Sequence, residues 1–128
     1  VICRDFDVES GLALNSESEL KLENGFAAFT KDFFDNGAYV IENNQTHEVS
    51  LRDPEGKNYL NVYFPEAPLF GLWSAEKKNA PYAAIEPWFG RCDKEDFNGS
   101  LEEREWGHAL AQGACFQAAY TIEIAGED

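Results

Sequence analysis

One carboxylate in the stretch YAAIEPWFGRCD, residues 82–93, has surroundings that suit a reactive group. Glu86 ends a short apolar strand pattern, and Pro87 follows it directly. Strand alternation places Glu86 on one face with Tyr82 and Ala84, which leaves a hollow beside the small alanine. Proline cannot donate to a ladder and keeps the preceding residue extended, so we expect strand pairing to end after Glu86. The pattern predicts a carboxylate held in one direction.

Aromatic and polar side chains follow this carboxylate. Trp88 and Phe89 offer flat apolar faces that could stack on a sugar ring, and Gly90 permits a tight bend. Arg91 and Asp93 could supply polar contacts to a small ligand. In the alternative interpretation, the carboxylate is a solvated strand end and the two aromatics form the edge of the core. The residues by themselves leave both interpretations open.

The elements that must position these residues read as strands. Turn signals recur at short intervals between apolar patterns of period two, which is typical of an antiparallel β protein. We predict strands at residues 19–23, 37–43, 47–53, 58–64, 69–73, 81–86 and 115–125, with single helical turns at 30–34 and 100–106. In the predicted hairpin 47–64, the turn DPEGK directs Leu60, Val62 and Phe64 inward. The fold class predicted is an all-β, antiparallel sandwich.

The clearest strand pattern is CFQAAYTIEIA, residues 115–125. Alternation separates polar positions from an apolar set, which is Phe116, Ala118, Tyr120, Ile122 and Ile124. We therefore expect one buried face and one solvated face along the whole of this segment.

Composition excludes several classes of function. The 128 residues suffice for about one domain, and the net charge of −14 repels nucleic acids and anionic membranes. No apolar run approaches the roughly 20 residues that span a bilayer. Three cysteines, an odd number without CxxC spacing, indicate neither a disulfide framework nor a zinc site. We expect a cytoplasmic protein with reduced thiols, or a truncated part of one.

The stretch around Glu86 resembles a known family. YAAIEPWFGRCD, preceded by LFGLWS and followed by LEEREWGHALAQGACFQAAYTIEI, is similar to the C-terminal half of aldose 1-epimerases (mutarotases) of the LacX-like branch. The resemblance implies that residues 1–128 are the C-terminal portion of one galactose mutarotase-like supersandwich domain with a sugar groove on one sheet. It also implies an isomerase of carbohydrate metabolism that interconverts the α and β anomers of a hexose and needs no cofactor.

The resemblance assigns a catalytic role to one residue. Glu86 stands where the family has the general base that takes the proton of the anomeric hydroxyl. The family's general acid is a histidine upstream of anything in this chain. Neither His47 nor His108 matches that histidine, and we expect both to be structural or exposed. We therefore expect this chain alone to be inactive.

Five residues are candidate substrate contacts. They are Trp73, Trp88, Arg91, Asp93 and Asp35. Each tryptophan could equally be a core aromatic. Arg91 and Asp93 could line the groove or pair with each other. The aspartate at 35, with Asp32 as the other candidate, matches a family substrate-binding aspartate only loosely, because Gly37 is an alternative occupant of that place. The acids of DKEDFNG lack the full calcium-loop pattern, so no metal is expected.

The expected partner is a small-molecule aldose, without nucleic acid or membrane. The missing N-terminal half of the domain, or a second copy, is the other candidate partner. The alternative function is a non-catalytic carbohydrate-binding sandwich or sugar sensor, and a third is an all-β interaction domain. Acceleration of mutarotation separates the first function from the others, and saturable sugar binding separates the second from the third.

Overall fold

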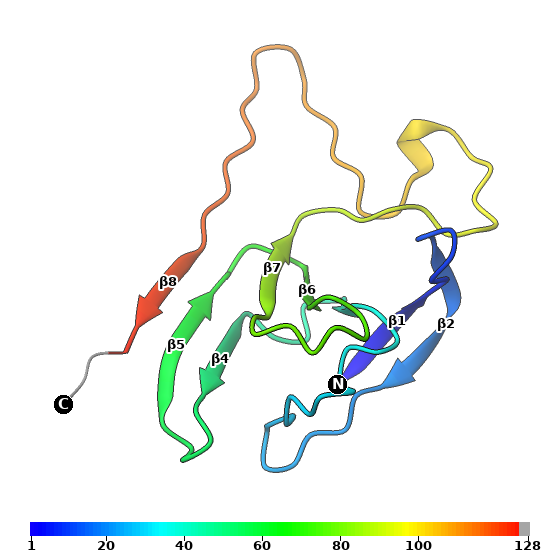
Figure 1. Ribbon diagram of the computed structural model, residues 1–128. Coiled ribbons are helices and arrows are strands. Elements are labelled where there is room, and N and C mark those ends of the chain that lie inside the picture. Colours follow the sequence, from blue (N-terminus) through cyan, green and yellow to red (C-terminus); the bar gives the residue numbers. More distant parts are fainter. Residues whose placement is uncertain (126–128) are drawn as a thin grey trace.

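The computed structural model describes residues 1–125, which form eight strands and one short 3₁₀ turn (Figure 1). The strands are β1 (Ile2–Phe6), β2 (Ala13–Glu19), β3 (Tyr39–Ile41), β4 (Glu48–Arg52), β5 (Asn58–Tyr63), β6 (Leu69–Trp73), β7 (Ala84–Trp88) and β8 (Thr121–Ile124), and the turn is η1 (Leu101–Glu103). All strand pairs are antiparallel, as the sequence predicts. No helix among these residues is long and apolar enough to cross a membrane.

Two sheets make up the fold. The larger has the order β2-β1-β3-β6-β7, and the smaller has the order β4-β5-β8. The register of the larger sheet aligns four residues in one row, because Arg4 pairs with Val40, Val40 with Gly71, and Gly71 with Glu86. Directly paired residues point their side chains to the same side of a sheet. We call this side of the five-stranded sheet the groove face.

The opposite side of the five-stranded sheet packs on β4 and β5. The buried core cluster comprises Cys3, Ile41, Val62, Phe64, Ala67, Phe70 and Leu72. Phe64 is 0% exposed and its ring centroid lies 5.1 Å from that of Phe70. The predicted hairpin and its inward residues Val62 and Phe64 are confirmed, and Leu60 packs at the margin of the cluster. Gly56 takes a φ of +87° in the hairpin turn, which favours glycine there.

The first two strands were missed by the sequence pattern. β2 has the sequence ALNSESE, and five of its seven residues are exposed, so it shows no apolar alternation. The strand predicted at 19–23 is wrong, since β2 ends at Glu19 and an isolated bridge between Glu23 and Phe26 follows. The predicted turn at 30–34 consists of hydrogen-bonded turns without a helix, while η1 confirms one helical turn within 100–106.

The prediction that pairing ends after Glu86 is wrong. β7 continues through Pro87, which pairs with Phe70, and through Trp88, which pairs with Leu69. β7 is an edge strand, and an edge strand tolerates a proline because one of its sides needs no ladder partner. The continuation matters because it keeps Trp88 on the same face as Glu86.

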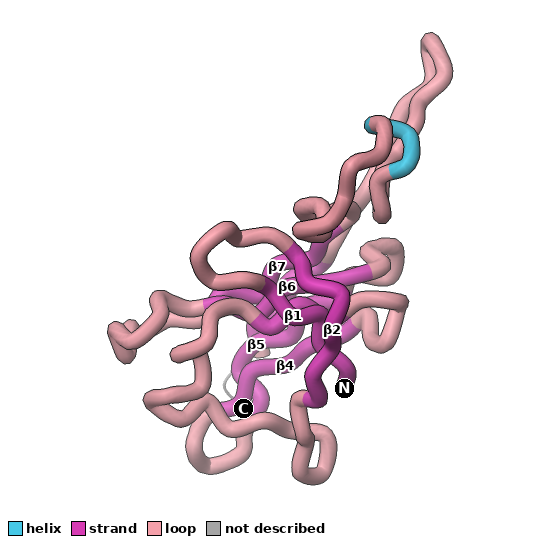
Figure 2. Tube along the Cα trace, turned by 90° about the vertical axis from the view of Figure 1, so that its right-hand side faces the viewer, coloured by secondary structure: helices cyan, strands magenta, loops and turns pink. Residues whose placement is uncertain are grey.

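The prediction for residues 115–125 is wrong over most of its length. Only Thr121–Ile124 forms β8, and residues 107–120 form an arm that rises away from the two sheets (Figures 1 and 2). The predicted buried set is exposed: Phe116, Ala118, Tyr120, Ile122 and Ile124. Ile122 pairs with the buried Val62, so it points to the core side of its sheet. Alternation reports this side correctly, but nothing in residues 1–125 covers it.

Candidate functional site

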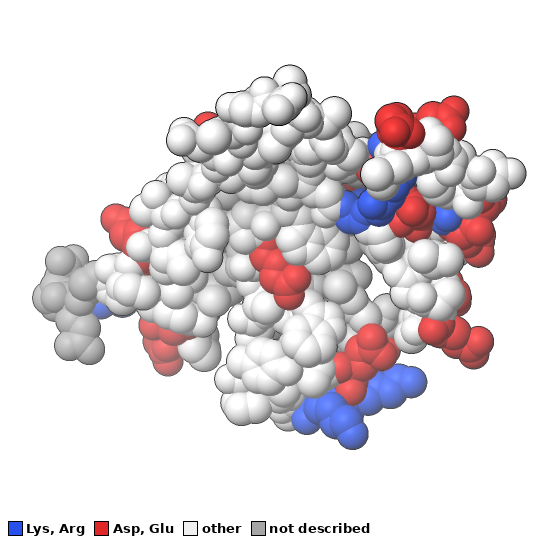
Figure 3. All heavy atoms as spheres, turned by 90° about the horizontal axis from the view of Figure 1, so that it is seen from above, with Lys and Arg blue, Asp and Glu red and all other residues white. Residues whose placement is uncertain are grey.

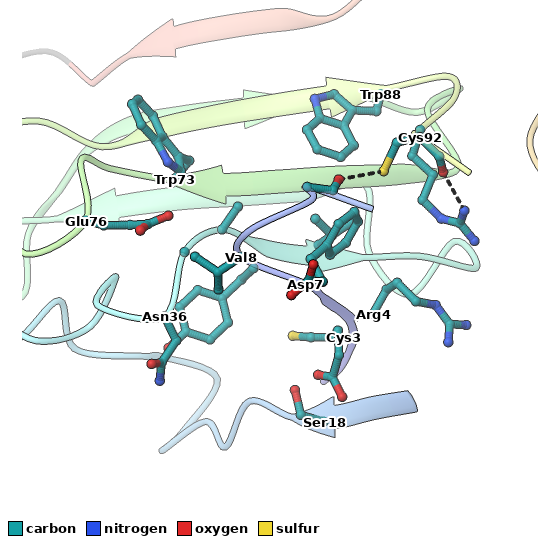
Figure 4. Close-up of a pocket in the computed structure, with 18 of the residues that line it drawn as sticks. Cys3, Arg4, Asp7, Val8, Ser18, Asn36, Trp73, Glu76, Trp88 and Cys92 are labelled. Carbon is teal, nitrogen blue, oxygen red and sulfur yellow. Dashed lines mark hydrogen bonds between the residues drawn. The ribbon is translucent and has the colours of Figure 1, made fainter. Parts of the chain in front are cut away.

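A cavity of about 840 Å³ opens on the groove face (Figure 4). Trp73 and Trp88, from β6 and β7, lie on one wall, and Asp7 and Val8 of the loop after β1 lie on the other. Ligand pockets for small molecules commonly have roughly 300–1,000 Å³. The cavity therefore has the size and the mixed polar and aromatic lining of a small-ligand site.

Hydrogen bonds hold the loop that carries Asp7. The Gly11 N–H donates to the Asp7 carbonyl at 2.8 Å, and the Cys92 thiol donates to the Gly11 carbonyl at 3.3 Å. Hydrogen bonds from the Ser10 hydroxyl and from backbone N–H groups hold the pKa of Asp7 below its ordinary value. The wall opposite the tryptophans thus presents an ionised carboxylate at neutral pH.

Glu86 is half-buried in the middle of β7, directly opposite Gly71. The Trp88 indole Nε1–H donates to Glu86 Oε2 at 3.1 Å. The strand pair on one side is Trp73 with Ala84, and that on the other side contains Trp88, so Glu86 stands between two tryptophans that line the cavity. Glu86 itself lies beside the cavity and is not part of its lining.

Trp73 is the more open of the two tryptophans. It is 37% exposed, and its ring lies 6.0 Å from that of Tyr82, between centroids. The small Ala84 opposite Trp73 leaves the ring accessible. Trp73 and Tyr82 therefore form an aromatic surface at the edge of the sheet, next to Ala84 and Glu86.

Arg91 lines the cavity with a side chain that is only 1% exposed. Its Nε donates to Glu42, its Nη2 donates to Glu105, and its Nη1 donates to the Cys92 carbonyl at 2.8 Å. Burial would lower the pKa of Arg91, but the hydrogen bonds and charges of the two glutamates outweigh it and raise the pKa. The guanidinium has protein partners on every nitrogen.

A second arginine, Arg4, extends this network on the groove face. Arg4 Nε donates to Glu42 at 3.3 Å, and its Nη2 donates to Glu17 at 2.7 Å. Its Nη1 lies within hydrogen-bond distance of three β2 carbonyls, the nearest being that of Asn15 at 3.0 Å. Within residues 1–125, no buried side-chain nitrogen or oxygen lacks a partner. Both arginines of the cavity are thus neutralised by carboxylates.

Two predicted substrate contacts lie outside the large cavity. Asp93 accepts a hydrogen bond from Arg104 at 2.7 Å and lines a separate cavity of about 370 Å³. Asp35 lines another cavity of about 250 Å³. Arg91 and Asp93 do not pair with each other, because each has another partner. The structure brings Trp73, Trp88 and Arg91 together in the cavity lining, and Glu86 lies beside it in contact with Trp88.

Both histidines contact backbone carbonyls, and that of Phe89 belongs to a residue of the cavity lining. His47 Nδ1 lies 3.1 Å from the Phe64 carbonyl oxygen, and His108 Nε2 contacts the Phe89 carbonyl. Neither lines the large cavity. The three cysteines are free, and no group of three or more possible metal ligands occurs in the described part of the chain.

Sequence reasoning missed part of the cavity lining. Asp7, Asn36, Glu76 and Arg4 all line it. The turn sequence DVESG could have indicated Asp7, because an aspartate before serine and glycine commonly caps a turn. The other three offered no signal, since they reach the cavity only through the sheet order and the loops.

Comparisons with known proteins agree with this fold. A galactose mutarotase related enzyme from Lactobacillus acidophilus is 29% identical with a TM-score of 0.80, over 98% of this chain and 42% of that one. A galactose mutarotase-like protein from Lactobacillus casei ATCC 334 is 22% identical with a TM-score of 0.83, over 97% of this chain and 42% of that one. No family profile matches the chain.

The fold is all-β and galactose mutarotase-like. Protein LacX, chromosomal, from Lactococcus lactis subsp. lactis is 27% identical over 88 residues, which are 69% of this chain and 27% of that protein. Together these likenesses support a galactose mutarotase-like, LacX-like family, as the sequence motifs predict. The chain spans less than half the length of each of these three relatives.

Proposed function

We propose that the protein containing this chain is an aldose 1-epimerase that interconverts the α and β anomers of a hexose, with Glu86 as its general base. The observation that carries the proposal is the position of Glu86 on the groove face, between two tryptophans that line an 840 Å³ cavity. A carboxylate beside an aromatic-walled cavity can meet a sugar hydroxyl while the ring rests on the aromatics. The mutarotase-like relatives support the same class of activity.

The reaction needs two proton transfers. Glu86 takes the proton of the anomeric hydroxyl, and an acid protonates the ring oxygen, so that the ring opens, the carbonyl group rotates and the ring closes. The family resemblance attributes the acid to a histidine upstream of this chain. The placement of His47 and His108, both outside the cavity lining, is consistent with an acid from elsewhere.

The charges of the cavity favour an uncharged aldose over a sugar phosphate. Arg4 and Arg91 are paired with carboxylates, while Asp7 and Glu76 add negative charge to the lining. A phosphate group would face this charge without a free cation among the described lining residues, which costs binding energy. Trp73 supplies the stacking surface for the sugar ring.

We also propose that residues 1–128 form the C-terminal portion of a larger domain. Residues 107–120 contain no Asp, Glu, Lys or Arg, although the whole chain has 34 such residues, 24 acidic and 10 basic. The arm accordingly shows an almost uncharged surface from above (Figure 3). Exposed Phe116, Ile122 and Ile124 offer apolar surface to the preceding part of the sandwich or to a second copy. Three free cysteines are consistent with a reducing cytoplasm.

Polarimetry or anomer-resolved NMR of freshly dissolved α-glucose and α-galactose tests the activity. The protein is used in the full length that its gene encodes. We expect accelerated mutarotation, and a loss of about 10²-fold or more in Glu86→Gln. Glu48→Gln, an isosteric change at an exposed glutamate of the other sheet, should keep the activity. Unchanged activity in Glu86→Gln would overturn the proposal.

The second candidate is a non-catalytic carbohydrate-binding sandwich or sugar sensor. The observation that favours it is that Glu86 lies beside the cavity and is not part of its lining. It predicts saturable binding of galactose or glucose by calorimetry with no acceleration of mutarotation in the full-length protein. Glucose 6-phosphate is the matched ligand, and the cavity charges predict weaker binding of it under either function.

A further inference from the structure

The pairing of β6 with β7 brings Trp88 and Gly71 next to Glu86, the proposed base. We infer that Trp88 is a positioning residue for the carboxylate of Glu86, and that Gly71 supplies the space that the indole ring needs. This inference rests on the proposed role of Glu86 and deepens it. It assigns Trp88 a contact with the carboxylate in addition to its place in the cavity wall.

The first observation is the hydrogen bond within β7. Trp88 follows Glu86 by two residues, so both side chains rise from the groove face. The indole Nε1–H donates to Glu86 Oε2 at 3.1 Å. Indole is a hydrogen-bond donor only, so it can hold the carboxylate but cannot itself take the proton that Glu86 is to accept. One carboxylate oxygen is held, and Oε1 is left to accept the substrate proton.

The second observation is the close approach of the Trp88 ring to Gly71. A Cβ atom added at Gly71 would lie 3.0 Å from Cζ2, 3.3 Å from Cε2 and 3.3 Å from Cη2 of Trp88. Cε2 is bonded to the indole nitrogen, so a side chain here would displace the donor itself. Gly71 is buried and its φ is not positive. The need for space therefore explains the glycine better than backbone conformation does.

The register explains why both contacts occur together. Gly71 pairs with Glu86, and Trp88 stands in the next pair, opposite Leu69. The indole therefore crosses diagonally from its own pair to the empty place opposite Glu86. A larger residue at position 71 would occupy that place. The three residues thus act together. Gly71 leaves space opposite Glu86, the Trp88 ring fills that space, and its nitrogen contacts the Glu86 carboxylate.

Holding the carboxylate matters because a base must meet the hydroxyl in one orientation. A free glutamate on an edge strand samples several rotamers, and restricting them in advance lowers the entropy lost at the transition state. The indole contact restricts Glu86 through one oxygen. Trp73, on the same face, keeps its ring open for the sugar.

Two variants of the full-length protein test, in different ways, whether Trp88 and Gly71 position Glu86. Trp88→Phe keeps an aromatic ring and removes the donor, whereas Gly71→Ala keeps donor and acceptor and displaces the ring. Hydrogen bonds to charged groups lead us to expect kcat about ten-fold lower or more in each variant, with KM changed less than about two-fold. Trp106→Phe, at a tryptophan outside the cavity lining, should keep both constants.

The double variant and a spectroscopic signal separate positioning from stability. In Trp88→Phe the donor is already absent, so adding Gly71→Ala should lower kcat little further, provided that thermal melting shows folded protein. The Trp88 indole resonance, assigned in ¹H–¹⁵N spectra by its loss in Trp88→Phe, should move in Glu86→Gln and in Gly71→Ala. A tryptophan that makes no contact with this carboxylate would leave this resonance unmoved in Glu86→Gln.

The outcomes distinguish the two proposals. Full activity in Glu86→Gln overturns the catalytic role of Glu86. Loss of activity in Glu86→Gln, with normal kcat in folded Trp88→Phe and Gly71→Ala, overturns the positioning role alone. An indole resonance that does not respond to Glu86→Gln also contradicts the positioning role, whatever the activity.

Discussion

Glu42 and Arg91 form an ion pair that is almost completely removed from water, with side chains 5% and 1% exposed. The pair joins the residue after β3 to the segment after β7, and Glu42 also accepts a hydrogen bond from Arg4 of β1. One carboxylate therefore links three segments on the groove face. The direction in which the chain leaves β7, and with it the end of the cavity, depends on this contact.

Removing Glu42 should destabilise the protein strongly. Glu42→Ala leaves the buried guanidinium of Arg91 with one fewer carboxylate, and breaking a buried ion pair from one side typically costs about 3–5 kcal/mol. Urea unfolding followed by circular dichroism measures the loss. Glu17→Ala, at the exposed end of the same network, should cost only about 0–1 kcal/mol. Equal small losses in both variants would contradict the buried role of Glu42.

Stability should fall at acidic pH partly through Glu105. Burial opposes its ionisation, but hydrogen bonds and charges of Arg91 and Lys94 outweigh burial and hold the pKa of Glu105 below its ordinary value of 4.5. A carboxyl with a lowered pKa in the folded state stabilises the protein above its unfolded pKa, and this is lost as pH falls through the folded value. Unfolding midpoints in urea should decline less in Glu105→Gln than in the wild type between about pH 5 and about pH 3. Parallel declines would refute this contribution.

Two phenylalanines should differ sharply in their effect on stability. Phe64 is fully buried in the core cluster, so Phe64→Ala should cost about 3–5 kcal/mol. Phe116 is 50% exposed on the arm, so Phe116→Ala should cost far less in the chain of residues 1–128. Chemical unfolding of that chain compares the two. A large loss for Phe116→Ala would favour the buried strand that its sequence pattern predicts.

The uncovered side of β8 should promote association of the isolated chain. Ile122 and Ile124 are 53% and 70% exposed on the core side of the smaller sheet. Replacing both by threonine keeps the β-branched shape and should reduce the apparent mass in size-exclusion chromatography with light scattering. Leu22→Thr, at an exposed leucine away from β8, serves as the control and should leave the mass unchanged. An unaltered mass in the β8 variant would show that association, if present, uses another surface.

The three thiols should react at different rates. Burial is the main cause that raises the pKa of the Cys3 thiol, and a thiol with a raised pKa has less of the reactive thiolate. Cys115 is exposed on the arm. Peptide mass spectrometry after brief iodoacetamide treatment at neutral pH should find Cys115 modified well before Cys3. Unfolding in urea should remove the difference, and equal rates in the folded protein would contradict the burial of Cys3.

Much of the fold could be predicted because the relevant signals are local. The hairpin of β4 and β5 follows from period-two alternation around DPEGK, and β6 follows from the apolar run LFGLW. β1 and β2 were not predicted because they are largely polar and show no apolar alternation. Their polar side chains form hydrogen bonds and ion pairs instead of packing in the core. Arg4 shows this best, since its side chain is 10% exposed only because two glutamates and the β2 carbonyls meet it.

By itself, the sequence determined the antiparallel β character, the acidic surface and the motif that names Glu86 as the residue of interest. These features depend on composition and on residues close together in the chain. Only the tertiary structure decided that Gly71 faces Glu86, that Trp88 lies over that glycine, and that Glu42 neutralises Arg91. Each of these contacts joins segments at least 15 residues apart or depends on strand register, and register is set by how the two sheets bury their shared face.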